Sequence, residues 1–130
     1  MEFNCIKESA LYITDIEQTS AFYNGILGLP IIVEKPDELI FFRAGNSILI
    51  CFIAEKSKSK THLPSHFGEG NLHFAFESKN GDYEGWKELI EKSGILIEKE
   101  VVWRDNKKSF YFRDPDNHSV EIVEIGIWDV

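Results

Sequence analysis

The pattern of apolar and polar residues predicts a first group of short elements in the N-terminal half. Ser9–Thr14 is apolar and β-branched and predicts a strand, and Asp15 is a favourable N-cap for a helix over Asp15–Leu27 that ends at Gly28. Apolar runs separated by turn residues predict three further strands: Pro30–Glu34, Glu38–Arg43 and Ser47–Ile53. This half therefore has the order βαβββ.

The same order of elements is predicted again in the C-terminal half. Leu72–Glu77 predicts a strand, and Asp82–Ser93 predicts a helix with one apolar face that ends at Gly94. Three more apolar runs predict strands: Ile95–Trp103, Ser109–Arg113 and Ser119–Glu124. Ala54–Asn71, the only long stretch without periodicity, is predicted to be a crossover or loop between the halves.

The halves also match residue by residue, which indicates a duplicated unit. Glu8-Ser-Ala-Leu aligns with His73-Phe-Ala-Phe, and Phe42-Arg43 aligns with Phe112-Arg113. We assign the second half a turn two residues longer after that point, which aligns Leu49 with Glu121. The prediction is one domain over residues 1–130, built from modules 6–54 and 71–125 that are joined by the loop 54–71.

The composition and the net charge exclude some classes of binding partner. The chain has 130 residues, and its 22 acidic side chains against 14 Lys and Arg give a net charge of −8. This balance argues against nucleic acid and anionic membranes as main partners. Cys5 and Cys51 lie in apolar stretches and are expected to be buried, reduced thiols. The N-terminus lacks the apolar core of a signal peptide, so we expect a cytoplasmic protein.

Three residues with metal-ligating side chains lie in or beside apolar strands: Glu8, His73 and Glu121. A buried glutamate is costly unless it is paired, hydrogen-bonded or bound to a metal. Two carboxylates and one imidazole, if they converge, would bind a divalent ion such as Zn, Mn, Fe, Ni or Co and leave positions open for substrate. Taken singly, each residue also fits an ordinary surface or hydrogen-bonded role.

Two longer motifs stand near the ends of the chain. The first runs from Glu8 through Asp15-Ile-Glu-Gln-Thr-Ser-Ala-Phe22-Tyr23 to Leu27-Gly28-Leu29, and the second is Phe112-Arg113-Asp114-Pro115-Asp116-Asn117-His118-Ser119-Val120-Glu121. Together they resemble the vicinal oxygen chelate superfamily, which includes glyoxalase I, extradiol dioxygenases, fosfomycin resistance transferases and bleomycin resistance proteins. The resemblance spans roughly residues 6–125. It implies an α+β fold of two βαβββ modules that form a curled, cupped mixed sheet, and a homodimer with its sites in the cups.

The resemblance also implies roles for the candidate residues. Glu121 falls on the terminal carboxylate ligand, His73 on the ligand that opens the second module, and Glu8 on a first position where many members carry histidine. Leu49 lies near the place of a fourth ligand in glyoxalase I.

The implied function is that of a metal-dependent enzyme acting on a small oxygenated substrate. Its chemistry would be glyoxalase-like or lyase-like, dioxygenation, or thiol addition. Glu8 or Glu121 is a candidate general base, and His66 is a candidate proton shuttle from the loop. The alternative is a metal-free protein of the bleomycin resistance type that sequesters a small, cationic drug or metabolite.

Five other side chains carry simpler expectations. Tyr12 faces either the site or the core, and Arg113 either forms a strand-end ion pair or binds an anionic substrate. His118 lies in the Asp114–Asn117 turn region and is expected to be exposed. Trp103 and Trp128 are expected to be packing residues.

Overall fold

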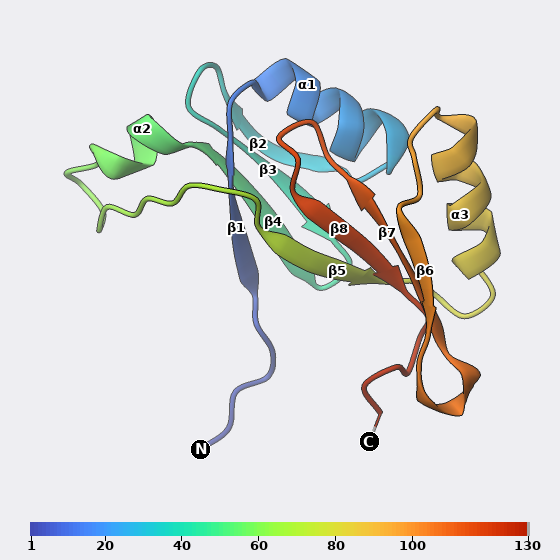
Figure 1. Cartoon of the computed structure of the whole chain (residues 1–130). Helices are drawn as coiled ribbons and strands as arrows, with labels where there is room; N and C mark the ends of the chain where they lie inside the picture. Colours follow the sequence, from blue (N-terminus) through green and yellow to red (C-terminus); the bar gives the residue numbers. More distant parts are fainter. Residues whose placement is uncertain (130) are drawn as a thin grey trace. The chain divides into compact units, whose positions relative to one another are not determined.

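The structure is a computed structural model that describes residues 1–129. The chain forms two compact units, one over residues 1–70 and the other from residue 71 onward, and each contains its own four-stranded mixed sheet (Figure 1). The predicted α+β class and the repeated βαβββ order are confirmed. Within residues 1–129, no helix has the length and apolar character that crossing a membrane requires.

The first unit follows the predicted order of elements. Its sheet has the strand order β1-β4-β3-β2, in which β1 is parallel to β4 and the other neighbours are antiparallel. The elements are β1 (Glu8–Ile13), α1 (Ile16–Ser20), its π-helical continuation η1 (Ala21–Ile26), β2 (Ile31–Lys35), β3 (Leu39–Ala44), β4 (Ser47–Ile53) and α2 (Ala54–Lys58). The short helix α2 lies inside the segment that was predicted to be irregular.

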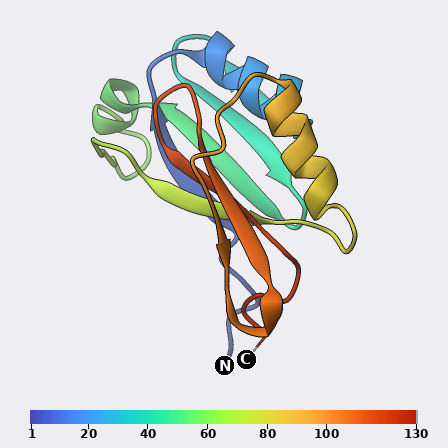
Figure 2. The same ribbon diagram turned by 45° about the vertical axis from the view of Figure 1, so that its right-hand side comes forward.

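Local sequence accounts for the helix and for the face on which it packs. Asp15 caps α1 as predicted, because its Oδ1 accepts a hydrogen bond from the Gln18 N–H at 2.8 Å. The helix α1 packs against β3 (Figure 2). Its continuation η1 buries Phe22 and Tyr23, and the Tyr23 ring lies 5.5 Å from that of Phe42. The alternate residues of the strands therefore supply the core on this side of the sheet.

The second unit repeats this architecture. Its sheet has the order β5-β8-β7-β6, in which β5 is parallel to β8 and α3 packs against β8. Phe110, Phe112, Val120 and Ile90 are fully buried and form its core. The elements are β5 (His73–Glu77), α3 (Tyr83–Lys92), β6 (Lys99–Val102), the 3₁₀ turn η2 (Arg104–Asn106), β7 (Lys108–Arg113) and β8 (Ser119–Val123). The strand predicted over Ile95–Trp103 is thus shorter than expected.

Strand register corrects the predicted alignment of the two halves. Glu8 pairs with Ile48 in the first sheet, and His73 pairs with Ser119 in the second. Position for position, Ile50 rather than Leu49 therefore corresponds to Glu121. The turn before the last strand is one residue longer in the second unit, not two, because Arg43 pairs with Ile48 and Arg113 pairs with Ser119. Leu49 instead lies in the core, with 3% of its surface exposed.

Cys5, Trp103 and Trp128 were predicted to be buried or packed, and all three are exposed. Each lies just outside a strand rather than within it. Cys51 is buried in β4 as predicted, but Cys5 is exposed because it precedes β1. Trp128 follows β8 and is 76% exposed. Trp103 follows β6 and is 44% exposed, although its indole N–H donates a hydrogen bond to Ser109 Oγ at 2.8 Å.

Candidate functional site

His73 and Glu121 come together on one face of the second sheet. His73 is the first residue of β5 and pairs with Ser119, while Glu121 pairs with Ala75 two residues further along. Because alternate residues of a strand share a face, the side chains of His73 and Glu121 point to the same side. His73 Nε2 lies 3.4 Å from Glu121 Oε2.

The main chain fixes which nitrogen of His73 carries a proton. His73 Nδ1 lies 3.0 Å from the carbonyl oxygen of Ser119. A carbonyl oxygen only accepts hydrogen bonds, so Nδ1 carries the proton and donates it. In the neutral ring, Nε2 then presents its lone pair toward Glu121. A backbone carbonyl that holds the far ring nitrogen is the usual support of a metal-binding histidine.

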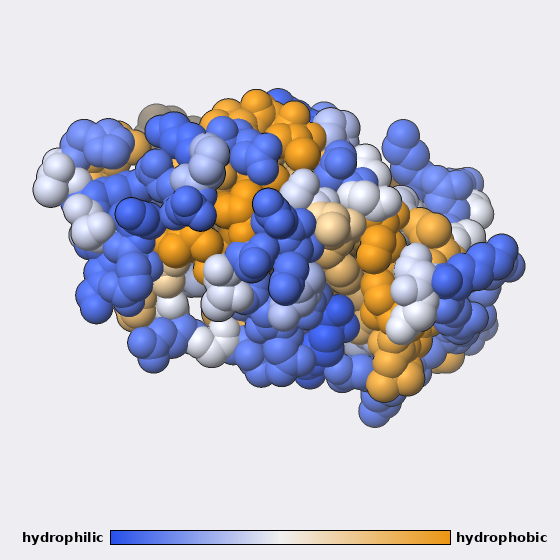
Figure 3. Space-filling view, turned by 90° about the horizontal axis from the view of Figure 1, so that it is seen from above, coloured by the Kyte–Doolittle hydropathy of each residue, from blue (hydrophilic) through white to orange (hydrophobic). Residues whose placement is uncertain are grey.

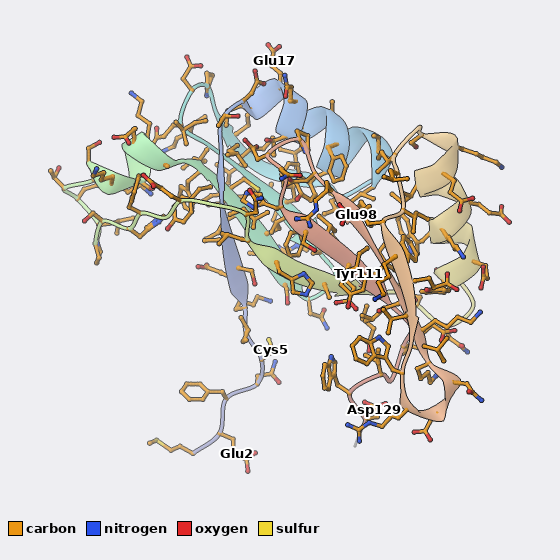
Figure 4. All side chains as sticks on the ribbon, viewed as in Figure 1. Glu2, Cys5, Glu17, Glu98, Tyr111 and Asp129 are labelled. Atoms are coloured by element: carbon orange, nitrogen blue, oxygen red, sulfur yellow. The ribbon has the colours of Figure 1, made fainter. Side chains whose placement is uncertain are left out.

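Tyr111 completes this cluster and was not predicted from the sequence. Its ring, labelled in Figure 4, belongs to β7. The ring stacks against that of His73, with centroids 6.0 Å apart and planes 29° apart. Burial, and then a hydrogen bond to Glu121, raise the pKa of Tyr111. The hydroxyl therefore keeps its proton at neutral pH and donates it to the carboxylate. Tyr111 pairs with Glu121 across the β7–β8 hairpin, so the hairpin register was the signal that could have identified it.

A short chain of donors and acceptors leads into this cluster from β6. The Trp103 indole N–H donates to Ser109 Oγ, and the Ser109 hydroxyl hydrogen-bonds to Tyr111 and lowers the pKa of Tyr111 by a smaller amount. Ser109 is fully buried. Ser109 and Glu121 are thus the polar side chains that act on the Tyr111 hydroxyl, with opposite effects on its pKa.

The pair His73–Glu121 has the donor chemistry and spacing that a divalent cation requires. Imidazole nitrogen and carboxylate oxygen suit Zn, Mn, Fe, Ni and Co. At metal–ligand distances of about 2.1 Å, two tetrahedral ligands lie about 3.4 Å apart, and the observed separation is 3.4 Å. The Glu121 side chain is 9% exposed and that of His73 is 52% exposed, so the pair combines a buried anchor with an open side.

Within the described residues of either unit, no third histidine, cysteine, aspartate or glutamate joins such a pair to form a metal-binding group. The third predicted ligand, Glu8, belongs to the first unit. It is exposed and is the first residue of β1, as His73 is of β5. It shares its side of the sheet with Ala10 and Tyr12.

His66 packs on the same side of the first sheet as Glu8, near the other end of β1. Its Nδ1 lies 3.0 Å from the Tyr12 hydroxyl, and its ring lies 4.5 Å from that of Phe52 in an edge-to-face arrangement. The backbone at Gly68, two residues after His66, lies close against the Tyr12 ring, because a Cβ on Gly68 would lie 2.5 Å from Tyr12 Cε2. Tyr12 is four residues from Glu8, which corresponds to about 13 Å along a strand. His66 can therefore reach only the far end of a molecule bound at Glu8.

Arg113 forms the predicted strand-end ion pair. Its Nε lies 2.6 Å from Glu98 Oε1, and its Nη1 donates to the Asn117 carbonyl at 3.1 Å. The hydrogen bond to Glu98 raises the pKa of the guanidinium. Arg113 therefore has structural partners in the turn and in the segment just before β6.

The predicted exposure of His118 is wrong. The Asp114–Asn117 turn forms as expected, since Asp114 Oδ1 accepts hydrogen bonds from the N–H groups of Asp116 and His118 at 3.0 and 2.8 Å. Asn117 adopts a positive φ of 64°, and the chain then directs His118 inward, where only 1% of its surface is exposed.

Comparisons with known proteins show the family to which the chain belongs. A family model described as Glyoxalase/Bleomycin resistance protein/Dioxygenase superfamily matches residues 6–122. The chain is 30% identical over 114 residues to a protein named Metallothiol transferase FosB from Staphylococcus haemolyticus, covering 85% of this chain and 76% of that protein. It is 25% identical over 115 residues to Glutathione transferase FosA from Serratia marcescens, covering 86% of this chain and 74% of that protein.

Similarity to a solved structure extends over the full chain. A crystal structure titled as lactoylglutathione lyase from Agrobacterium tumefaciens matches with a TM-score of 0.94 and 30% identity, covering 100% of both chains.

Proposed function

Since the chain belongs to the glyoxalase/bleomycin resistance protein/dioxygenase superfamily, we propose that it is a metal-dependent enzyme that transfers a thiol to a small oxygenated substrate. The observation that carries the proposal is the pair His73–Glu121, with 3.4 Å between its donor atoms and with the His73 proton held on Nδ1. The names of the two relatives, a metallothiol transferase and a glutathione transferase, favour thiol transfer among the reactions of this superfamily.

In this proposal His73, Glu121 and Glu8 hold one divalent ion, which is Zn, Mn, Fe, Ni or Co. When bound, the ion acts as a Lewis acid that polarises a substrate oxygen. Because ligands are drawn from both modules, the two units act as one domain. The Ser119 carbonyl orients His73, and the Tyr111 hydroxyl orients Glu121.

In this proposal, side chains of the protein also accept and return the proton of the incoming thiol. The thiol gives up its proton to a base, and its sulfur forms a bond to a substrate carbon while the bond from that carbon to its oxygen breaks. The protonated base then returns the proton to the released oxygen. Glu8 or Glu121 is the proposed base when it is not bound to the ion. His66, hydrogen-bonded to Tyr12, is the proposed proton carrier for a polar group at the far end of a long thiol, away from the reacting sulfur.

A second candidate reaction is glyoxalase-like isomerisation, which the similarity to a structure titled as lactoylglutathione lyase favours. The non-enzymatic alternative is a binding protein that sequesters a small drug or metabolite. Such a protein would bind its ligand without a metal ion and would not convert it.

The test is an assay of both reactions with protein purified without chelator or nickel resin. Glutathione or cysteine is mixed with fosfomycin and each of the five ions, and adducts are followed by mass spectrometry. The thioacetal of glutathione and methylglyoxal tests isomerisation. We expect an ion-dependent adduct that Glu121→Gln reduces at least about a hundredfold. Binding of a small molecule without turnover under any of these conditions would instead support the sequestering protein.

A second copy of this chain is the proposed partner. Edge strands of sheets commonly bear pairing surfaces, and both β2 and β6 are edge strands. On β2, Ile31, Ile32 and Val33 are 39%, 42% and 38% exposed, and Val102 on β6 is 61% exposed. Hydrophobic areas among hydrophilic ones are visible in Figure 3. An assembly of two copies would cover such areas.

Removing the Tyr111 hydroxyl is expected to weaken metal binding. Tyr111→Phe keeps the stacking on His73 but removes the donor to Glu121, so the dissociation constant for Mn²⁺ or Co²⁺ should rise about 10- to 100-fold. Titration against a competing chelator measures it. Tyr83→Phe is the control, because Tyr83 is a buried tyrosine of the second unit that packs against Phe110 on the opposite side of the sheet. Equal affinities in the two variants would show that the hydroxyl does not orient Glu121.

A further inference from the structure

His118 is a fully buried histidine that the proposed reaction does not use. It lies between the Asp114–Asn117 turn and β8, and 1% of its surface is exposed. Its Nδ1 accepts a hydrogen bond from the backbone N–H of Leu72 at 2.9 Å. Because this nitrogen accepts, it carries no proton while the bond exists.

The partner of this bond, Leu72, is the residue directly before the proposed ligand His73. Leu72 also accepts a hydrogen bond at its carbonyl from the Ser119 N–H at 2.8 Å. Ser119 in turn accepts from His73 Nδ1 at 3.0 Å. The N–H and C=O of Leu72 are thus both held by the segment that leads into Glu121.

The backbone of His118 is hydrogen-bonded to Asp114 in the Asp114–Asn117 turn. Its N–H donates to Asp114 Oδ1 at 2.8 Å, and its carbonyl accepts from the Asp114 N–H at 3.2 Å. Asp114 is itself buried, with 6% of its surface exposed. The hydrogen bonds therefore form a continuous path from Asp114 through His118 and Leu72 to the residue that precedes His73.

We propose that His118 is a positioning residue that holds the start of β5 in place and thereby sets the position of the His73 ring against Glu121. This inference rests on the proposed function only in giving His73 the role of a ligand. His73 is the first residue of its strand, and strand ends fray unless a neighbouring segment holds them. The ladder begins at the pair His73–Ser119, so the bond from Leu72 to His118 extends the attachment one residue beyond it.

The bond requires an acceptor close to the main chain of residue 118. The oxygen of an asparagine side chain can occupy the place of Nδ1, whereas a leucine of similar bulk has no acceptor. His118→Leu therefore removes the acceptor and His118→Asn restores it. In the metal-free protein, His118→Leu should speed hydrogen exchange at the Leu72 amide by at least about tenfold and shift the ring signals of His73, and His118→Asn should reverse most of both effects.

Metal affinity gives the second measurement. The dissociation constant for Mn²⁺ should rise about 10- to 100-fold in His118→Leu and stay within about threefold of the wild-type value in His118→Asn. A folded His118→Leu protein with wild-type affinity, or equal loss in both variants, would overturn the positioning role. If the wild-type protein binds no ion, the proposed function fails, while the exchange and ring signals still decide the role of His118.

One measurement needs no variant. In protein labelled with ¹⁵N, we expect a scalar coupling across the hydrogen bond between the Leu72 amide nitrogen and His118 Nδ1. Its absence would overturn the inference even if His118→Leu does not fold.

Discussion

Replacing Glu121 with glutamine is expected to remove the rise in melting temperature that a divalent ion gives the wild-type protein. The amide keeps the shape of the side chain but is a much poorer ligand for a divalent ion. An ion at about 100 times its dissociation constant stabilises the folded state by about 2.7 kcal/mol, which corresponds to a shift on the order of 10 °C for a domain of this size. Melting curves with and without Mn²⁺, Zn²⁺, Fe²⁺, Ni²⁺ or Co²⁺ measure it.

The matched control is Glu34→Gln, because Glu34 is an exposed strand glutamate on β2. It should shift the free energy of unfolding by less than about 0.5 kcal/mol and leave the ion-dependent rise intact. If Glu121→Gln keeps the full rise, Glu121 is not a ligand. If the wild-type protein shows no rise with any ion, the sequestering protein becomes the better account.

The second large effect is expected from Leu49→Glu. Leu49 is 3% exposed and lies in β4 between Ser9 and Phe42 of the neighbouring strands. A carboxylate there would be buried without a partner, so the free energy of unfolding should fall by about 3 kcal/mol or more. Domains of this size have a total stability of about 5–15 kcal/mol. Denaturant unfolding, followed by fluorescence, measures the change.

Ile50→Glu provides a control at the adjacent position. Ile50 pairs with Ala10 and Phe41 and points to the opposite side of the sheet, where it is only partly buried. Its loss of stability should be smaller than that of Leu49→Glu by at least about 1 kcal/mol. Equal losses would mean that the two positions do not lie on opposite faces as the register requires.

The local pattern of the sequence predicted most of the fold. Apolar runs bounded by turn residues identified the strands, with Ser47–Ile53 correct at both ends. Asp15 identified the start of the first helix because its capping bond depends on residues close in sequence. The change to a π-helix at Ala21–Ile26 was not predicted, because apolar spacing does not distinguish it from an α-helix over so few residues.

The sequence predicted which segments are strands better than it predicted how the residues of neighbouring strands pair. Alternation has a period of two, so a misplaced gap of one residue moves a side chain to the other face, and this error placed Leu49 where Ile50 belongs. The burial of His118 depends on a bond to Leu72, which is 46 residues away in the sequence. Tyr111 was missed because its role follows from the hairpin pairing with Glu121 and not from a motif.

The most direct test of the central claim is the metal content of the wild-type protein, measured by mass spectrometry of its elements after purification without chelator or nickel resin. The proposal predicts about one divalent ion per chain, from the single set of ligands formed by His73, Glu121 and Glu8. A content near zero that does not rise after incubation with any of the five ions would contradict it.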